Sequence, residues 1–307
     1  MEIVKQNVLF LVFNRIEPAK KVLKQINYYK PQILYVSCDG WRNSKEKEKV
    51  LKIRQYIINN TREEIKLITK FNDTNLGCKI AVSSAINWFF SNEDSGIILE
   101  DDCLPNKSFF EFMNLNLTNY RNDDSVISIN GCNLGFVSNS GKPFKTTYMN
   151  MWGWGTWKKS SNLISYDISN RDIIKNIPKI YQTISKSHKR KNKMIIFIYW
   201  IIKFFNLRKI NTWDYQWIFF QLKSNKLSIS PGKNLVSNIG FNDSATHTTN
   251  KESPISNIKT YDLDNDNLLS DSCNQNFIYE DDYATKKWEN ITYLNTLKGL
   301  VKLIFNL

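Results

Sequence analysis

The stretch Gly96-Ile-Ile-Leu-Glu-Asp-Asp-Cys-Leu-Pro105 decides the fold of this 307-residue chain. Its apolar part, Gly96 to Leu99, predicts a short buried strand, and strand pairing is expected to stop at Pro105 because proline has no N–H to donate. The acidic triplet Glu100-Asp101-Asp102 follows the strand directly. At about 6 Å and an effective dielectric near 20, each pair of carboxylates repels by roughly 2–3 kcal/mol. The triplet therefore predicts a compensating hard divalent cation or nearby Lys and Arg side chains, unless it is a solvated acidic turn.

The chain before this strand alternates apolar runs with amphipathic stretches, which predicts a parallel sheet with right-handed crossovers. The expected fold is α/β, with a Rossmann-like, mostly parallel central sheet flanked by helices. Ligands of such sheets bind at the carboxyl ends of the strands, where Asp39 and the acidic triplet fall. The G-x-G-x-x-G pattern and the P-loop are both absent, which argues against a dehydrogenase or a P-loop NTPase. The expected strands are Val8–Phe13, Ile33–Ser37, Ile65–Phe71, Gly96–Leu99 and Val126–Gly131, and the expected helices are Ala19–Ile26, Lys45–Ile58 and Ile80–Phe90.

The composition narrows the classes of protein and partner. The net charge of +13 favours an anionic partner such as a phosphorylated substrate, an anionic membrane or nucleic acid. A hydrophobic content of 42% is enough for a sizeable core. The five cysteines show no C-x-x-C pair, so we expect reduced thiols in a cytosolic compartment rather than disulfides or a zinc site. With two histidines in the chain, a His-rich metal centre is excluded.

Two aromatic stretches follow in the second half of the chain. Residues 149–157 hold three tryptophans and two glycines, which suits either a sugar-stacking element that includes Trp154 or a tryptophan-rich corner of the core. In Thr212–Phe220, Asp214 lies between two tryptophans. Partial desolvation makes a carboxylate a better base, and an N-cap aspartate on a core helix is the alternative. The polar loop that ends at His247 is able to close over an anion, and His247 itself is a weaker candidate base.

Two further stretches combine basic and apolar residues. Residues 186–209 place basic side chains on both sides of the apolar run Met194–Ile202, which suits either the headgroup zone of an anionic membrane or a core helix with basic ends. Residues 294–305 have the spacing of an amphipathic surface helix. No signal peptide and no run of about 18 apolar residues is evident, so we expect a soluble or peripheral protein.

Together these residues resemble the GT-A fold glycosyltransferases. The likeness is closest to the eukaryotic β-1,2-N-acetylglucosaminyltransferases and the bacterial nucleotide-diphospho-sugar transferases similar to them. Its most specific part is the acidic triplet followed by Pro105 and Phe109-Phe110, and Gly153-Trp154 and Trp213-Asp214 come next. The resemblance implies a GT-A domain over residues 1–250, with a basic and apolar insertion near 186–209. A C-terminal extension over residues 251–307 would end in the amphipathic helix.

The resemblance also implies a role for each matching residue. Asp102 matches the acid that binds the catalytic Mn²⁺ (or Mg²⁺), which in turn holds the donor diphosphate. Glu100 and Asp101 match the ribose and sugar side of the donor site, and Asp39 matches the acid that contacts uracil. Asp214 matches the region of the general base in inverting members. Further nucleotide contacts are expected from Asn14, Arg15 and Lys79. The family has a histidine in the helix before the acidic triplet, which this chain lacks, and Lys79 lies near that position and could contact the nucleotide instead. The relatives read Trp-Asp-Asp-Trp where this chain reads Trp-Asp-Tyr-Gln-Trp, so the register of the base stays open.

The sequence therefore predicts a metal-dependent, inverting glycosyltransferase at the inner face of the cytoplasmic membrane. It would move a sugar, GlcNAc or a related hexose, from a UDP-sugar to a hydroxyl of a lipid-linked or surface-glycan acceptor. The leaving UDP develops charge that a divalent ion stabilises, and the acceptor hydroxyl needs a base. One alternative is a sugar-phosphate nucleotidyltransferase, although the loop Phe13-Asn-Arg-Ile-Glu-Pro18 is not glycine-rich as in that class. The other is a non-catalytic nucleic-acid-binding protein, which the charge alone suggests and no recognised motif supports.

Overall fold

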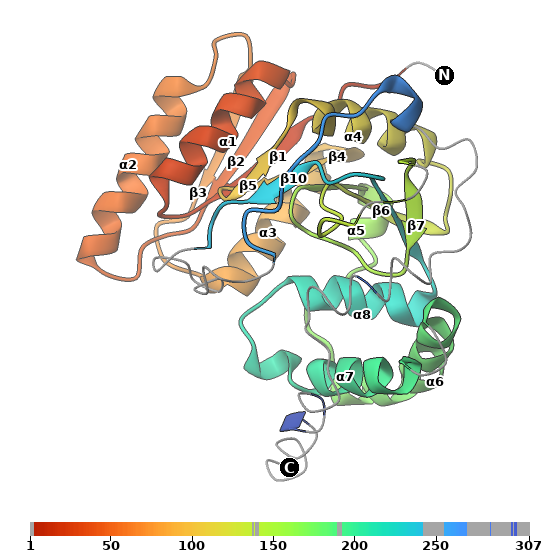
Figure 1. Cartoon of the computed structure of the whole chain (residues 1–307). Coiled ribbons are helices and arrows are strands. Elements are labelled where there is room, and N and C mark those ends of the chain that lie inside the picture. Colours follow the sequence, from red (N-terminus) through yellow and green to blue (C-terminus); the bar gives the residue numbers. More distant parts are fainter. Residues whose placement is uncertain are drawn as a thin grey trace.

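The central sheet has eight strands among the described residues of the computed structural model (Figure 1). The structure describes residues 3–136, 138, 141–188, 192–241 and 255–268, together with Tyr283, Thr296, Lys298 and Gly299. In sheet order the strands are β3 (Lys66–Phe71), β2 (Ile33–Cys38), β1 (Val8–Val12), β4 (Ser95–Glu100), β8 (Trp154–Trp157), β6 (Val126–Asn130), β9 (Leu227–Ser230) and β7 (Phe144–Thr146).

The half of the sheet that precedes the acidic triplet is parallel, as predicted. Val8 of β1 pairs with Leu34 of β2 on one side and with Ile97 of β4 on the other. β1 is buried along its whole length, which explains its continuous apolar sequence. The helices α1 (Ile16–Tyr29), α2 (Ser44–Asn60) and α3 (Gly77–Asn92) connect these four strands in the predicted order.

The other half of the sheet is mixed. β8 runs antiparallel to both β4 and β6, β9 is parallel to β6, and β7 is antiparallel at the edge. Six of the eight described strands thus share one direction, which confirms the mostly parallel α/β sheet. Two short strands leave the main sheet: β5 (Cys103–Pro105) pairs antiparallel with β10 (Val236–Asn238). Pairing therefore ends at Pro105, but in a second small sheet that the sequence did not predict.

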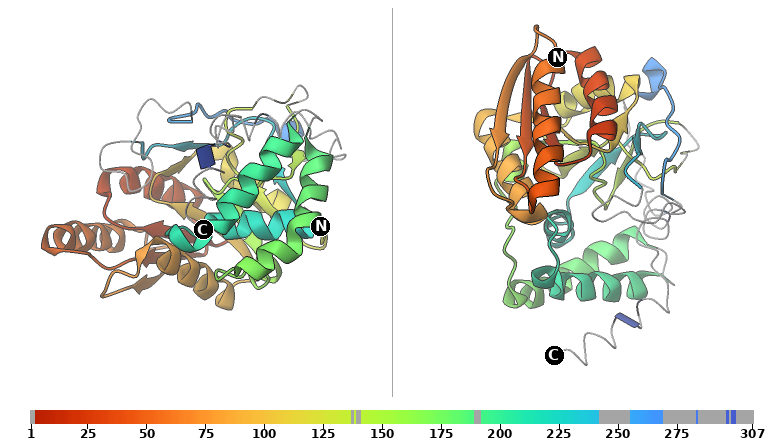
Figure 2. Two further views of the ribbon diagram at one scale, coloured as in Figure 1. Left: turned by 90° about the horizontal axis from the view of Figure 1, so that it is seen from below. Right: turned by 90° about the vertical axis from the view of Figure 1, so that its left-hand side faces the viewer.

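Helices cover both faces of the sheet (Figure 2). Successive residues of a strand point to opposite faces, so Phe10 and Leu99 join one core, whereas Leu9 and Ile98 join the other. The first core packs against α1, α2 and α4 (Lys107–Asn119), and the second against α3 and the C-terminal helices. The helix α5 (Lys158–Ser161) follows β8 and contacts α3.

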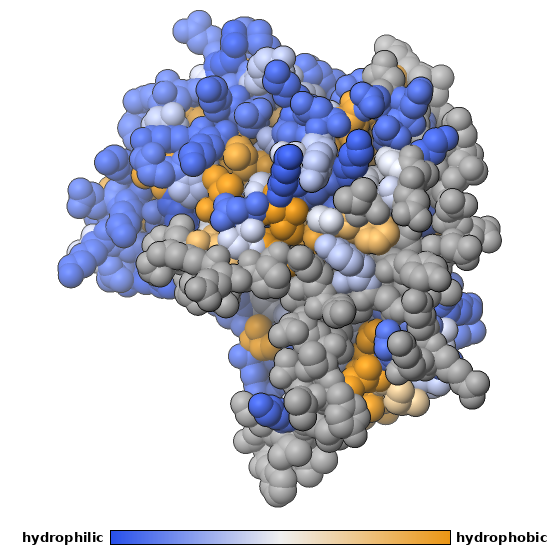
Figure 3. Space-filling view, in the orientation of Figure 1, coloured by the Kyte–Doolittle hydropathy of each residue, from blue (hydrophilic) through white to orange (hydrophobic). Residues whose placement is uncertain are grey.

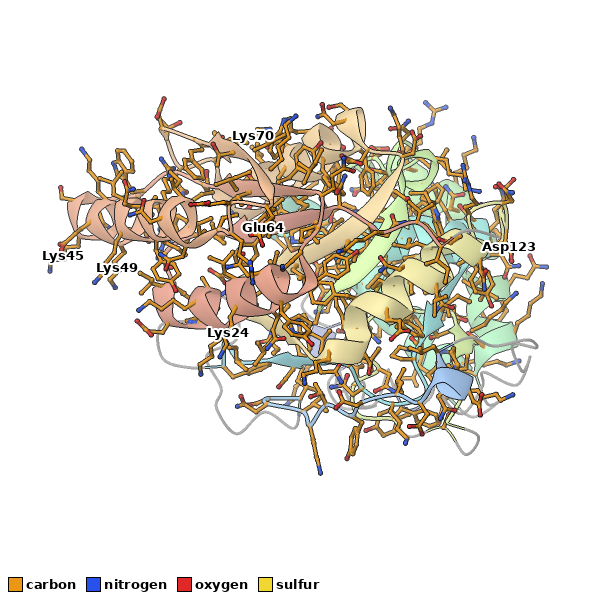
Figure 4. The ribbon with its side chains drawn as sticks, turned by 90° about the horizontal axis from the view of Figure 1, so that it is seen from above. Lys24, Lys45, Lys49, Glu64, Lys70 and Asp123 are labelled. Carbon is orange, nitrogen blue, oxygen red and sulfur yellow. The ribbon has the colours of Figure 1, made fainter. Side chains whose placement is uncertain are left out.

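Basic side chains gather on the outside of the first helical layer. Figure 4 shows Lys24 of α1 and Lys45 and Lys49 of α2 pointing away from the sheet. The same region is hydrophilic in the space-filling view of Figure 3. Part of the net positive charge therefore lies on a solvated helical face.

Three helices form a unit beneath the sheet, here called the helical unit (Figure 1). They are α6 (Asn170–Ser187), α7 (Lys193–Phe205) and α8 (Asp214–Ser224), with the short helix η1 (Leu207–Lys209) between the last two. The basic and apolar stretch 186–209 is mainly α7, whose Ile196, Trp200 and Phe204 are buried in the second core. One face of α7 is thus a core face, as one of the two readings predicted. Within the described residues no helix combines the length and apolar character that crossing a membrane requires.

Some expectations fall on residues that the structure does not describe. His247 and most of its loop lie there, as does most of the amphipathic stretch 294–305. The division of the chain at residue 250 stays a prediction.

Candidate functional site

The candidate site lies at the carboxyl edge of the parallel strands, where open α/β sheets bind ligands. A cavity of about 830 Å³ opens there, within the range of about 300–1,000 Å³ that is usual for small-molecule sites. Loops after β1, β2 and β4 line it together with the N-terminus of α3, the helical unit and the segment after β10. Its acidic residues are Asp39, Glu100, Asp101, Asp102 and Asp214, and the basic residues among the described lining are Arg15, Arg42 and Lys203.

Arg15 neutralises two acids of the triplet. β1 and β4 are parallel neighbours, so the loop after β1 meets the end of β4 at the same edge of the sheet. From that loop Arg15 forms an ion pair through Nη2 with Oδ1 of Asp101 and a second through Nη1 with Oδ2 of Asp102, at 2.9 Å. Asp101 Oδ2 also accepts a hydrogen bond from the backbone N–H of Phe13 at 3.4 Å. The acid repulsion that the sequence predicted is therefore met in part by an arginine.

One guanidinium does not balance three acids. Burial raises the pKa of Glu100, and the neighbouring carboxylates of Asp102 and Asp101 raise it further. Burial also raises the pKa of Asp101, although Arg15 acts in the opposite direction. Negative charge is therefore disfavoured in this poorly solvated cluster, and a bound cation would stabilise the ionised carboxylates in place of protons.

The segment after β10 packs directly on Asp102. The N–H of Ile239 donates to the backbone oxygen of Asp102 at 2.9 Å. A Cβ at Gly240 would lie 2.1 Å from Oδ2 of Asp102 and 2.7 Å from Nη1 of Arg15. Only a residue without a side chain fits there, so Gly240 sets how closely this wall approaches the acids.

Asp39 holds the adjoining loops together. Its carboxylate accepts hydrogen bonds from the backbone N–H groups of Leu76 and Gly77, at the start of α3, at 3.0–3.1 Å. It also accepts from Nδ2 of Asn72 at 3.1 Å and Nδ2 of Asn75 at 3.0 Å. These contacts fix the end of β2 against the N-terminus of α3, and the predicted contact with a nucleotide base would come in addition to them.

A second basic residue lies near the Asp39 end of the cavity. Arg42 follows β2 and pairs with the buried Glu46 at 2.5 Å. Asn14 donates to the same carboxylate at 2.8 Å and is not among the residues that line the cavity. Asn14 thus contacts Glu46 rather than the cavity. Arg42, which pairs with the same glutamate, is the residue that lines the cavity. Its position in the loop after β2, which begins with Asp39, was a signal that could have found Arg42.

The helical unit builds a further wall of the cavity. Asp214 is the first residue of α8, and its Oδ1 accepts hydrogen bonds from Thr212 Oγ1 and from the N–H of Tyr215. The preceding loop is tied to the sheet side, because Oδ1 of Asn211 accepts from the N–H of Lys79 at 2.9 Å. Lys79 contributes this backbone contact to the site's frame and is not among the lining residues.

The tryptophan-rich stretch divides between core and cavity. Trp154 in β8 is fully buried, stacked on Trp213 with ring centroids 5.9 Å apart and edge-on to Trp217. Trp152 lines the cavity instead. Gly153 between them has φ +62°, a turn in the left-handed region that glycine adopts readily. The core reading thus describes Trp154, and Trp152 is the tryptophan of this stretch that lines the cavity.

The structure brings together six of the residues predicted for the site. They are Arg15, Asp39, Glu100, Asp101, Asp102 and Asp214. Asn14, Lys79 and Trp154 lie behind the lining, and His247 lies outside the described residues. The lining residues that sequence reasoning missed include Arg42, Trp152, Tyr199, Lys203 and Tyr215.

The residues of the site could supply only some of the ligands that a divalent cation needs. No group of three or more His, Cys, Asp and Glu side chains in the described part of the chain is arranged to hold a metal. Carboxylate oxygens are the ligands that Mg²⁺ and Mn²⁺ prefer, and Mg²⁺ is often held by one or two carboxylates plus substrate phosphates. The carboxylates beside Asp102 suit that arrangement. A cation here would be held through Asp102, with most of its other ligands supplied from outside the described part of the chain.

Comparisons with known proteins identify no family for this chain. No family model matches it, and no curated protein matches its sequence. Weak matches among solved structures include a UTP-bound UGPase from Acinetobacter baumannii, with 9% identity, a TM-score of 0.37, and coverage of 76% of this chain and 88% of that one. A UDP-glucose pyrophosphorylase complexed with UDP-glucose matches with 10% identity, a TM-score of 0.34, and coverage of 76% and 91%. HddC from Yersinia pseudotuberculosis matches with 14% identity, a TM-score of 0.31, and coverage of 50% and 77%. At these values the likeness assigns neither family nor activity.

Proposed function

We propose that this chain is a metal-dependent glycosyltransferase that moves a sugar from a UDP-sugar donor to an acceptor hydroxyl. The observation that carries the proposal is one cavity lined by two chemically different groups of residues. The acidic triplet with Arg15 is the proposed donor end, and Asp214 with the aromatic residues of the helical unit is the proposed acceptor end. Transfer between a diphosphate donor and an alcohol needs a charge-stabilising end and a base end in a single site.

At the donor end, Asp102 would hold the cation together with the diphosphate, and Arg42 would face its anionic oxygens. When bound, Mn²⁺ or Mg²⁺ supplies a positive charge that stabilises the leaving UDP. Glu100 and Asp101 lie on the ribose and sugar side in this arrangement. Arg15 positions Asp101 and Asp102 through its two ion pairs.

At the acceptor end, Asp214 is the base of the proposed inverting reaction. Both of the hydrogen bonds described for its carboxylate go to Oδ1, from Thr212 and Tyr215. In the proposed reaction Oδ2, which neither of these hydrogen bonds uses, accepts the proton of the acceptor hydroxyl as that oxygen attacks the anomeric carbon. The bond from the anomeric carbon to the diphosphate oxygen breaks, and UDP leaves with the electron pair.

We further propose that the acceptor is lipid-linked or part of a surface glycan, and that the enzyme contacts an anionic membrane through the outer side of α7. Met194 on that helix is 51% exposed. Ile198 is half-buried on the same helix, and Ile202 lies beside Gly299 of the C-terminal segment. Basic residues near exposed apolar side chains suit the headgroup zone of an anionic bilayer.

A sugar-phosphate nucleotidyltransferase is the second candidate. Arg15 favours it, because a cation in the loop after the first strand suits a nucleoside triphosphate. The loop itself argues against it, since Phe13-Asn-Arg-Ile-Glu-Pro18 contains no glycine to bring backbone N–H groups close to phosphates.

The first experiment measures thermal unfolding with UDP-, GDP-, CMP- and dTDP-sugars, with and without Mn²⁺. A ligand at about 100 times its Kd stabilises the folded state by about 2.7 kcal/mol. We expect a Mn²⁺-dependent shift with UDP-sugars that Asp102→Asn removes. Asp214→Asn should keep the shift and lose transfer to acceptor. Release of pyrophosphate from UTP and a sugar 1-phosphate would support the second candidate, and no shift with any nucleotide would overturn both.

A further inference from the structure

Arg15 and Lys203 face different acids of the cavity. Arg15 forms ion pairs with Asp101 and Asp102 of the acidic triplet. The carboxylate that acts on the charge of Lys203 is that of Asp214. Lys203 therefore belongs to the Asp214 side of the cavity, which is within electrostatic reach of Glu100.

Lys203 is held in place on the Asp214 side. It lies in the last turn of α7, where the helix dipole favours a positive charge. Its Nζ donates to the hydroxyl of Tyr215 at 3.0 Å. The same atom lies 5.3 Å from the ring centroid of Tyr199 and 4.9 Å from that of Tyr215. Lysine and both tyrosines line the cavity, so an ammonium group and two aromatic rings are presented together.

The surroundings of Lys203 favour an anionic partner. Burial lowers the pKa of Lys203, and the carboxylate of Asp214 opposes that shift. A bound anion would add to the effect of Asp214 and stabilise the charged amine. The rings of Tyr199 and Tyr215 lie beside the ammonium group and add aromatic surface to the same wall of the cavity.

We propose, resting on the glycosyltransferase function above, that Lys203 forms an anion subsite for the acceptor, which is therefore a sugar bearing a phosphate or a carboxylate. The ammonium group pairs with that anion while the tyrosines contact the sugar ring. Asp214, beside it, then meets a hydroxyl of the same acceptor. Lys203 selects the acceptor by charge and takes no part in the bond changes.

The test titrates three sugars that differ at one carbon into protein saturated with UDP and Mn²⁺. Glucose is neutral, glucuronic acid carries a carboxylate, and glucose 6-phosphate carries a phosphate. A charge-assisted hydrogen bond in a partly buried site predicts that an anionic sugar binds about tenfold more tightly than glucose. The stronger of the two anionic sugars identifies whether the acceptor anion is a phosphate or a carboxylate.

Variants of Lys203 separate loss of the anion subsite from changes in UDP affinity or in folding. Lys203→Gln should abolish the preference for anionic sugars, Lys203→Arg should retain most of it, and UDP affinity should not change. Lys223→Gln is the matched control, because Lys223 of α8 also lies near two aromatic rings, at 5.2 and 5.4 Å, and does not line the cavity. Thermal unfolding of each variant confirms that it is folded.

The outcomes distinguish the two proposals. No preference for charge in the wild type, or a loss in Lys203→Gln of UDP affinity alone, would overturn the acceptor subsite and leave the transferase proposal standing. Absence of UDP binding in the wild type, with Lys203-dependent binding of anionic sugars in the free protein, would overturn the transferase proposal and retain the anion subsite.

Discussion

Arg15 holds one oxygen of Asp101 and one of Asp102, both of which are buried. Removing one partner of a buried ion pair leaves an uncompensated charge and costs about 3–5 kcal/mol. We predict a loss of about that size in the free energy of unfolding for Arg15→Gln at pH 7.5, measured by urea denaturation. Arg62→Gln is the control, since Arg62 pairs with Glu64 at 2.9 Å and their side chains are 46% and 53% exposed, so its loss leaves no buried charge.

The Arg15 variant should also change the dependence of stability on pH. The pKa of Asp101 in the folded state lies above its ordinary value because of burial, so the folded state binds the proton more tightly than the unfolded state. Stability therefore falls as pH rises from the unfolded pKa to the folded one. Without Arg15 the folded pKa rises further, so the deficit of Arg15→Gln should be smaller at pH 5 than at pH 7.5. Equal deficits at both values would contradict this electrostatic account.

Asp39 has a structural role that can be separated from nucleotide binding. Its carboxylate accepts from Asn72, Asn75 and the N–H groups at the start of α3. Leaving buried donors unsatisfied costs about 1–3 kcal/mol. We predict that Asp39→Ala lowers the free energy of unfolding by about 3 kcal/mol, by chemical denaturation. Unchanged stability with lost UDP affinity would instead assign Asp39 to the base contact alone.

At the scale of elements, the pair β5–β10 controls the shape of the acidic end. It brings Gly240 so close to Asp102 and Arg15 that a Cβ has no room. We predict that Gly240→Ala displaces the Asp102 carboxylate and abolishes the Mn²⁺-dependent thermal shift with UDP-sugars. Ser237→Ala, in β10 and outside the lining, should keep the shift. A full shift in Gly240→Ala would mean that Asp102 does not hold the cation.

A comparison of predicted and observed elements shows which strands and helices the apolar pattern of the sequence can predict. The runs that became β1 and β4 were predicted to within about one residue at each end, because strands buried on both faces leave continuous apolar sequences. The short strands β5, β7 and β10 carry no such pattern, since each has three residues and owes its pairing to distant segments. The two readings of residues 186–209 could not be separated either, because an apolar helix suits both a core and a membrane surface.

At the scale of the whole molecule, the excess positive charge predicts association with anionic membranes. We expect the protein to co-sediment with vesicles that contain phosphatidylserine and to dissociate as salt is raised, because exposed charges are screened. If the outer side of α7 makes the contact, Met194→Glu should weaken binding more than Lys45→Glu on α2, which Figure 4 shows on the other helical layer. Equal weakening by both variants would indicate a diffuse electrostatic attraction without insertion of α7.

The sequence by itself determined the parallel sheet and the acids at its edge. Strand periodicity is local, and the carboxyl ends of parallel strands meet wherever the strands pair, so Asp39 and the triplet were found without the structure. Arg15 was found through the resemblance to a known family. Only the tertiary structure decided that Trp152 and not Trp154 lines the cavity, and that Tyr199 and Lys203 of α7 reach it. Those outcomes depend on a turn at Gly153 and on which face of α7 packs against the sheet. Helix orientation is settled by long-range packing, which no local pattern of residues records.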